Sequence, residues 1–456
     1  MIEKNTVIEL KIEDMTKDGE GIGHFNGYTL FVKDAVIGDV ITAKVMKAKK
    51  SYGYARLMDV LTPSSDRVEP PCPEARKCGG CQLMAMSYEA QLKFKNRLVE
   101  NTLKRIGGFQ DIKIEKIIGM DDPVRYRNKA QYPVGIAGGE IAAGFYARHS
   151  HNIMVHDDCL LSPKINNEIT AAVIEWMEKY NIRPYDETTG EGLVRHILVR
   201  EAFATGEILV CIVVNGTDAP HTEHLADTLM SIKNVVGVCL NVNKVRGNVI
   251  LGNKNIRIAG NDYIEDKIGD VKYRISPLSF YQVNPAQTRK LYDTVKEFAA
   301  LTGNEIVWDL YCGIGTISLY TAKKARGIIG IEVIPQAVDD AKVNAGLNGI
   351  KNAKYYAGTA EEVMPEILKQ LDEQGFGDNN VAIVDPPRKG CDRKLINALL
   401  ELSPDRIVYV SCDPATLARD MRILSDGGYE VVKVQPVDMF PHTVHVETVC
   451  LLSRNK

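Results

Sequence analysis

The stretch EIVWDLYCGIG, from Glu305 to Gly315, places a short apolar run directly before a glycine-rich turn. Beyond it, β-branched apolar runs of strand length alternate with amphipathic helical segments. This alternation predicts a doubly wound α/β sheet over residues 279–456. The last two runs are separated only by DMFPHT, which is too short for a parallel crossover. We therefore expect the sheet to end in an antiparallel hairpin.

The chain before residue 279 predicts two further domains. Residues 1–63 contain five short strand-like runs with glycine-rich turns, which is typical of an oligonucleotide-binding (OB-like) β-barrel. A Pro- and Ser-rich linker follows, and residues 64–278 predict a central α+β domain whose strands look antiparallel. Its basic amphipathic helix over residues 88–107 is a candidate for packing on the C-terminal domain instead.

Composition places the chain among ordinary globular proteins. Its 456 residues are 45% hydrophobic and 25% charged, with a net charge of −3. No apolar run reaches membrane-spanning length and no signal peptide is recognisable, so we expect a cytoplasmic protein without membrane partners, and a monomer. Five cations and two tyrosines alternate in residues 44–56, which fits either a solvated strand edge or a phosphate-tracking patch.

Four predicted strands end in polar or reactive residues. Ligands of doubly wound sheets bind outside the carboxyl ends of the strands, so these residues predict the site. Gly313 and Gly315 permit a tight turn close to a ligand, and Glu332 is spaced to accept hydrogen bonds from ribose hydroxyls. These features indicate a nucleoside-containing cofactor, either NAD or S-adenosylmethionine.

The motif DPPR, which begins at Asp385, favours adenosylmethionine. Two prolines after an acid make a rigid loop without backbone N–H groups, suited to holding a planar base or an amino group by oxygen atoms. Such a loop has no obvious use in hydride transfer. Ser318 also replaces the third glycine of a dinucleotide fingerprint.

Five motifs together resemble the RNA uracil-C5 methyltransferases, which are adenosylmethionine-dependent enzymes. They are SFYQVNP, DLYCGIGTISL, DPPRKG, VSCDPATLARD and HVETVCLL, and they cover the C-terminal domain. The N-terminal segment DGEGIGHFNGYTLFVKDAVIGDV resembles the TRAM RNA-binding barrel of many family members. The resemblance implies C5 methylation of a uridine in RNA, with 23S ribosomal RNA preferred over the T-loop of transfer RNA.

The resemblance also assigns roles to individual residues. Cys412 corresponds to the nucleophile that adds to C6 of uracil, and Glu447 to the acceptor of the C5 proton. His442 and His445 are rival bases of suitable pKa. The implied cofactor contacts are Gln282, Tyr311, Gly313, Gly315, Glu332 and Asp385. The candidate RNA contacts are Phe280, Arg388 and Lys389.

Four further cysteines suggest a metal site. Cys72, Cys78 and Cys81 lie in the glycine-containing segment CPEARKCGGC, and Cys159 is a plausible fourth ligand. Three clustered cysteines and a remote one suit an iron–sulfur cluster, whereas structural zinc sites more often use paired C-x2-C knuckles. The resemblance implies [4Fe-4S], and zinc is the alternative.

Two other functions remain open at this stage. One is an iron–sulfur oxidoreductase with a nucleotide domain, which Ser318 and the DPPR motif disfavour. The other is a non-catalytic RNA-binding factor on a methyltransferase scaffold, against which the intact Cys412 and Glu447 argue.

Overall fold

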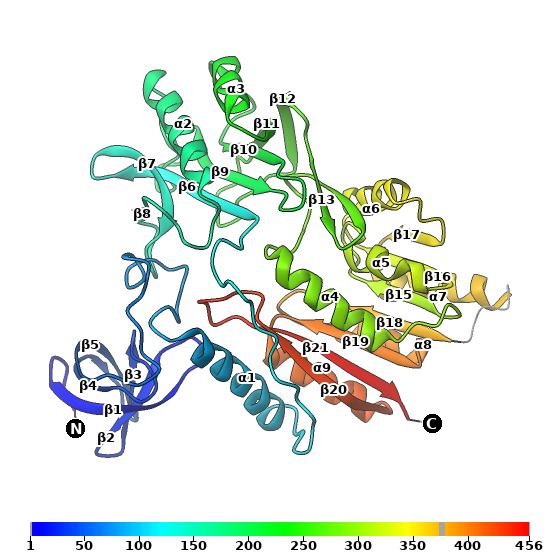
Figure 1. Ribbon diagram of the computed structural model, residues 1–456, viewed down its shortest axis with the longest axis horizontal. Helices are drawn as coiled ribbons and strands as arrows, with labels where there is room; N and C mark the ends of the chain where they lie inside the picture. Colours follow the sequence, from blue (N-terminus) through cyan, green and yellow to red (C-terminus); the bar gives the residue numbers. More distant parts are fainter. Residues whose placement is uncertain (1, 374–378, 456) are drawn as a thin grey trace.

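The computed structural model describes residues 2–373 and 379–455, and Figure 1 shows them as three units joined in chain order. The barrel lies at the N-terminal end, a helix-covered sheet forms the central unit, and a larger α/β unit contains the C-terminus (Figure 1). No helix among the described residues is long and apolar enough to cross a membrane.

The N-terminal unit is a closed barrel of five strands in the order β1-β2-β3-β5-β4. Alternate side chains such as Leu30, Val32 and Ile41 fill its interior because successive residues of a strand face opposite sides. The predicted OB-like barrel is confirmed. The strands are β1 (Val7–Met15), β2 (Gly21–Phe25), β3 (Tyr28–Lys33), β4 (Val40–Ala48) and β5 (Tyr52–Thr62).

The central unit is a seven-stranded sheet in the order β12-β11-β10-β9-β6-β7-β8. Helices α2 and α3 cover one face and enclose an apolar core that includes Trp176 and Ile212. The elements are β6 (Lys129–Ala137), β7 (Glu140–Tyr146), β8 (Ile153–Val155), α2 (Ile165–Lys179), β9 (Val194–Glu201), β10 (Ile208–Val214), α3 (Thr222–Ser231), β11 (Val235–Val242) and β12 (Lys254–Gly260).

One pairing in this sheet differs from the sequence-based expectation. Strands β10 and β11 are parallel, whereas we expected antiparallel strands throughout. The reason is α3, which the sequence reading overlooked and which supplies the crossover that a parallel pair requires.

The C-terminal sheet has the order β17-β16-β15-β18-β19-β21-β20, with apolar clusters on both faces. Strands β15 to β19 pair in parallel, and β21 runs antiparallel between β19 and β20. The doubly wound fold with a terminal antiparallel hairpin is confirmed. The elements are α4 (Pro285–Ala299), β15 (Ile306–Leu310), α5 (Thr316–Thr321), η1 (Ala322–Lys324), β16 (Gly327–Glu332), α6 (Pro335–Leu347), β17 (Ala353–Ala357), α7 (Ala360–Glu373), β18 (Asn380–Val384), α8 (Arg393–Leu402), β19 (Arg406–Ser411), α9 (Pro414–Asp426), β20 (Tyr429–Val437) and β21 (Glu447–Arg454).

Two segments from before residue 279 lie against this C-terminal unit. Helix α1 (Tyr88–Arg105) packs along α9, and its buried Lys95 forms a 2.5 Å ion pair with Asp438 between β20 and β21. The hairpin of β13 (Ile264–Ile268) and β14 (Val271–Ile275) packs on α6, where Asn344 accepts a hydrogen bond from the backbone of Arg274. The C-terminal sheet is therefore braced from both sides.

Candidate active site

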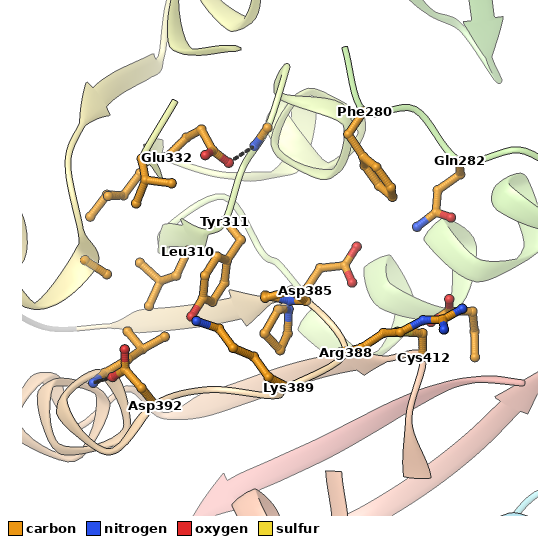
Figure 2. Close-up of a pocket in the computed structure, with 18 of the residues that line it drawn as sticks. Phe280, Gln282, Leu310, Tyr311, Glu332, Asp385, Arg388, Lys389, Asp392 and Cys412 are labelled. Carbon is orange, nitrogen blue, oxygen red and sulfur yellow. Dashed lines mark hydrogen bonds between the residues drawn. The ribbon is translucent and has the colours of Figure 1, made fainter. Parts of the chain in front are cut away.

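A cavity of about 720 Å³ opens at the carboxyl ends of the strands of the C-terminal sheet. Figure 2 shows residues from four strand ends and from the segment before α4 around this space. The predicted site residues among its lining are Phe280, Gln282, Tyr311, Gly313, Glu332, Asp385, Arg388, Lys389, Cys412 and Glu447. Gly315 is not among the lining residues; it is the N-cap of α5, which begins at Thr316.

The turn after β15 brings backbone close to the cavity. Gly313 has a φ of 54°, and a Cβ there would meet no described atom within 4 Å. Tyr311 also has a positive φ, 89°, which is strained for a residue with a bulky side chain and is typical of functional sites. The turn therefore leaves room for a ligand beside its backbone.

Glu332 stands at the end of β16 and is already oriented by the backbone. Its carboxylate accepts a hydrogen bond from the N–H of Gly313 at 3.2 Å (Figure 2). It accepts a second from the N–H of Ile334 at 3.0 Å. Since each carboxylate oxygen has more than one lone pair, both oxygens can still accept further bonds. This arrangement suits a carboxylate that holds ribose hydroxyls.

Asp309 lies beneath the turn and is fully buried. Both the backbone N–H and the hydroxyl of Ser318 donate to its carboxylate. Burial raises the pKa of Asp309 to about 6 in spite of these bonds. Ser318, which replaces the third glycine of a dinucleotide fingerprint, thus ties α5 to the end of β15.

The DPPRKG loop after β18 is held by α9. Buried Asp420 accepts hydrogen bonds from the N–H of Cys391 at 2.8 Å and from the hydroxyl of Tyr409 at 2.7 Å. Arg419 donates to the carbonyl oxygens of Lys389 and Cys391. The sequence reading missed this role, although both side chains belong to the ARD end of the motif VSCDPATLARD.

Cys412 directly follows β19, where Asp413 caps the next helix. The Asp413 carboxylate accepts hydrogen bonds from the backbone of Ala415 and Thr416, and Pro414 occupies the first position of α9. Burial, together with the neighbouring Glu447 and Asp385, raises the pKa of the Cys412 thiol to about 12. The free thiol is therefore protonated at neutral pH and has to lose its proton when it attacks.

Glu447 begins β21 and lies beside Cys412. Strands β19 and β21 are antiparallel with Ser411 opposite Thr448, so Cys412, one residue further along the chain, lies next to Glu447, one residue earlier. Glu447 is buried, and its Oε2 has no hydrogen-bond partner. Burial raises the pKa of this carboxyl to about 8, and the proximity of Asp385 adds to the effect. It is thus a carboxyl poised to exchange a proton near neutral pH.

Asp385, at the end of β18, is the second acid of this group. Burial raises its pKa to about 7, and Asp309 contributes. Since an ionised Asp385 raises the pKa of Glu447, the two carboxyl groups resist ionising together.

The two histidines considered as rival bases are placed differently. His445 lines the cavity, and burial followed by the nearby cation Arg388 lowers its pKa. His442 does not line it. Its backbone N–H and its Nδ1 bond to Gln91 of α1, and its carbonyl accepts from Gln82. His442 therefore has a structural role, and His445 remains geometrically suitable as a base.

The segment before α4 forms the wall opposite the strand ends. Phe280 is 66% exposed and projects toward the cavity, whereas Gln282 is buried (Figure 2). The central unit anchors this segment from behind, since Arg200 donates to the carbonyl of Ser279 and Asn128 donates to that of Gln282. An exposed aromatic ring on an anchored backbone suits stacking against a base.

The four candidate metal ligands come from two loops of the central unit. Burial raises the pKa of the Cys78 and Cys81 thiols, and the nearby thiolates of Cys72 and Cys159 raise them further. Arg125 holds the second loop by donating to the carbonyl of Cys159 at 2.7 Å. Within residues 2–373 and 379–455, no three Cys, His, Asp or Glu side chains gather closely enough to hold a metal ion. The predicted metal site is thus not supported by this geometry.

Comparison with known proteins identifies the family. A family model described as tRNA (Uracil-5-)-methyltransferase matches residues 213–455, and one for the TRAM domain matches residues 3–58. The chain is 48% identical over 452 residues to an uncharacterized RNA methyltransferase of Halalkalibacterium halodurans, covering 99% of this chain and 98% of the relative. The chain belongs to the tRNA (uracil-5-)-methyltransferase family. The family resemblance inferred from the five motifs is therefore confirmed.

Other relatives agree with this membership. An uncharacterized RNA methyltransferase of Clostridium acetobutylicum is 46% identical over 456 residues, covering 99% of this chain and 98% of the relative. The crystal structure of the Pyrococcus abyssi tRNA (uracil-54, C5)-methyltransferase in complex with S-adenosyl-L-homocysteine has a TM-score of 0.78 and 28% identity. The match covers 98% of this chain and 100% of that one. The similarity thus extends over all three units.

Proposed function

We propose that this chain methylates C5 of a uridine in RNA, using S-adenosylmethionine and a covalent bond between Cys412 and C6 of the base. The observation that carries the proposal is the convergence of Cys412 and the unpaired carboxyl of Glu447 in one cavity beside the glycine turn. Family membership supports the reaction class, because it makes the chain an RNA methyltransferase.

In the proposed mechanism, the Cys412 thiol releases its proton to solvent and its sulfur adds to C6 of uracil. That addition places negative charge on C5, which would then take the methyl group of bound adenosylmethionine. The bond between that methyl and the sulfonium sulfur would break, and S-adenosylhomocysteine would leave. Glu447 in its ionised form accepts the C5 proton, after which the carbon–sulfur bond breaks and the thiolate leaves. The thiolate then takes the proton held by Glu447, so both residues are restored with one methyl group transferred and one proton released.

The cavity residues fit adenosylmethionine, which supplies the electrophilic methyl group when bound. The open space beside Gly313 and the free lone pairs of Glu332 suit its adenosine half. The proposed contacts for the rest of the adenosylmethionine molecule are Asp385, Gln282 and Tyr311. In support, the matching Pyrococcus abyssi structure is a complex with S-adenosyl-L-homocysteine.

The covalent step is tested with RNA in which 5-fluorouridine replaces uridine. Fluorine cannot leave C5 as a proton does, so the adduct accumulates and a protein–RNA band persists in a denaturing gel. We expect the band with the native chain and adenosylmethionine, and its loss with Cys412→Ala. An undiminished band in that variant would refute the nucleophile assignment.

We propose 23S ribosomal RNA as the substrate, by resemblance to family members that combine a TRAM barrel with the four-cysteine loop. Transfer RNA is a second candidate, favoured by the name of the Pyrococcus abyssi enzyme, whose chain is matched in full. Mapping 5-methyluridine in both RNAs from a strain lacking this protein separates the two. A loss confined to transfer RNA would overturn our first choice.

The barrel is proposed as an RNA-binding unit. It carries a cluster of aromatic rings, Phe31, Tyr52 and Tyr54, whose centroids lie 5.6–5.9 Å apart. The Lys49 ammonium lies 5.1 Å from the centroid of the Tyr52 ring. Partly exposed rings and cations in this arrangement can stack on bases and bind phosphates, so they favour an RNA-binding surface over a merely solvated strand edge. The division at residues 63 and 278 remains a prediction.

A [4Fe-4S] cluster at Cys72, Cys78, Cys81 and Cys159 is likewise kept as a proposal. In its support, two loops distant in sequence bring these thiols close enough to perturb one another. Its role would be structural, since the proposed methyl transfer needs no electrons. Iron and acid-labile sulfide are measured after anaerobic purification. Stoichiometric zinc without sulfide would favour the alternative metal.

A further inference from the structure

Three cations lie together where the central sheet meets the cavity. Strands β6 and β9 are antiparallel, and Lys129 is directly opposite Arg200 in their register. Residues directly opposite each other project from the same face of a sheet, so the two cationic side chains are neighbours. Arg127 precedes Lys129 by two residues and lines the cavity. Like charges placed opposite each other destabilise a sheet, so this arrangement calls for a functional reason.

Within the described ranges, Arg127, Lys129 and Arg200 form no ion pair. Arg200 is only 1% exposed, and its Nε and Nη1 have no hydrogen-bond partner. Burial, together with the nearby Arg200 and Arg127, lowers the pKa of Lys129 to about 8. Burying a charge without a partner costs free energy. A group of unpaired cations in this position is therefore expected to bind an anion.

The cations are continuous with the wall that carries Phe280. The Nη2 atom of Arg200 donates a hydrogen bond to the carbonyl of Ser279 at 2.8 Å. Asn128, between Arg127 and Lys129, donates to the carbonyl of Gln282 at 3.0 Å. The three cations therefore border the wall that forms one side of the cavity.

We propose that Arg127 and Lys129, backed by buried Arg200, form a phosphate subsite for the RNA strand that carries the target uridine. The inference rests on the proposed function, because a uridine that reaches Cys412 must be turned out of its stack and brings its flanking phosphates to the cavity rim. Arg127 and Lys129 are partly exposed and contact the phosphates. Arg200 strengthens the positive field and fixes the wall.

The test measures the affinity of Arg127→Gln and Lys129→Gln for unmethylated ribosomal RNA and for oligouridylate over a range of salt concentrations. Each lost phosphate contact should lower the slope of log affinity against log salt by about 1, to a similar extent for both RNAs. Lys233→Gln is the matched control. It removes an exposed cation from the turn between α3 and β11, remote in sequence from the cavity segments, and should keep the native slope. Calorimetric binding of adenosylmethionine should be the same in all four proteins.

The outcomes separate the subsite from the function itself. If the native chain forms the 5-fluorouridine adduct while both Gln variants keep its affinity and salt slope, the subsite is wrong and the proposed function stands. If the native chain forms no adduct and transfers no methyl group to RNA, the function fails regardless of the salt slopes. Loss of adenosylmethionine binding in the variants would indicate damage to the wall and overturn a phosphate role.

Discussion

Glu447→Gln should stabilise the protein at alkaline pH while abolishing methyl transfer. In the native fold, burial and Asp385 raise the pKa of Glu447 from its ordinary value of 4.5 to about 8. Between these values the folded state holds a proton that the unfolded state has lost, so stability is greatest at low pH and falls as pH rises. Each pH unit in this window costs about 1.4 kcal/mol. Gln carries no such proton and removes the dependence.

The expected size follows from the window. From pH 5.5 to 8 the native chain should lose about 3 kcal/mol relative to Glu447→Gln, which corresponds to a difference in Tm of about 6–12 °C. Thermal unfolding of both proteins is recorded at pH 5.5, 7 and 8, without cofactor. Glu401→Gln is the control, because Glu401 is exposed near the end of α8 and should leave the pH dependence unchanged.

The result that would refute this reasoning is a difference between the two proteins that does not vary with pH. It would mean that Glu447 ionises in the fold as it does in water, so that the carboxyl is hydrated and not held in the buried pair. A variant less stable than the native chain at pH 8 would contradict the sign of the argument as well.

Two further predictions concern the support of the site. Lys95→Met leaves Asp438 buried without its cation and should lower the free energy of unfolding in urea by about 3–5 kcal/mol. Lys93→Met, which removes an exposed ion pair on the same helix, should change the free energy of unfolding far less. Equal effects would show that the buried pair is hydrated. Gly390→Ala would place a Cβ 2.5 Å from the Asp420 carboxylate at a backbone φ of 75°. We therefore expect the free energy of unfolding to fall by at least about 1 kcal/mol and adenosylmethionine binding, measured by calorimetry, to weaken. Native values of both quantities would contradict the tight packing of the DPPRKG loop.

Much of the candidate site could be read from strand ends alone. Glu332, Asp385 and Cys412 each stand at the carboxyl end of a predicted parallel strand, and such strands share one carboxyl edge, so the three had to meet. Glu447 was different. It needed the family resemblance, because the linear pattern indicates a hairpin but not that β21 enters the sheet between β19 and β20.

Other features depended on long-range contacts with little local signal. The hold of Asp420 on the DPPRKG loop joins residues 29 positions apart. The juxtaposition of Lys129 and Arg200 follows from the pairing of β6 with β9, which lie far apart in the chain. The parallel pairing of β10 and β11 required recognition of α3, a short helix without a side-chain cap at its start.

The sequence by itself determined the barrel, the doubly wound sheet, the terminal hairpin and the family, because these depend on periodicity, turn residues and motif spacing along the chain. Tertiary structure decided which groups became chemically special. The raised pKa values of Cys412, Asp385 and Glu447 all have burial as their main cause, and burial exists only once the strands and the 279–283 wall enclose the cavity. The order of residues states which groups are present, whereas the dielectric and the neighbours that tune them arise from the fold.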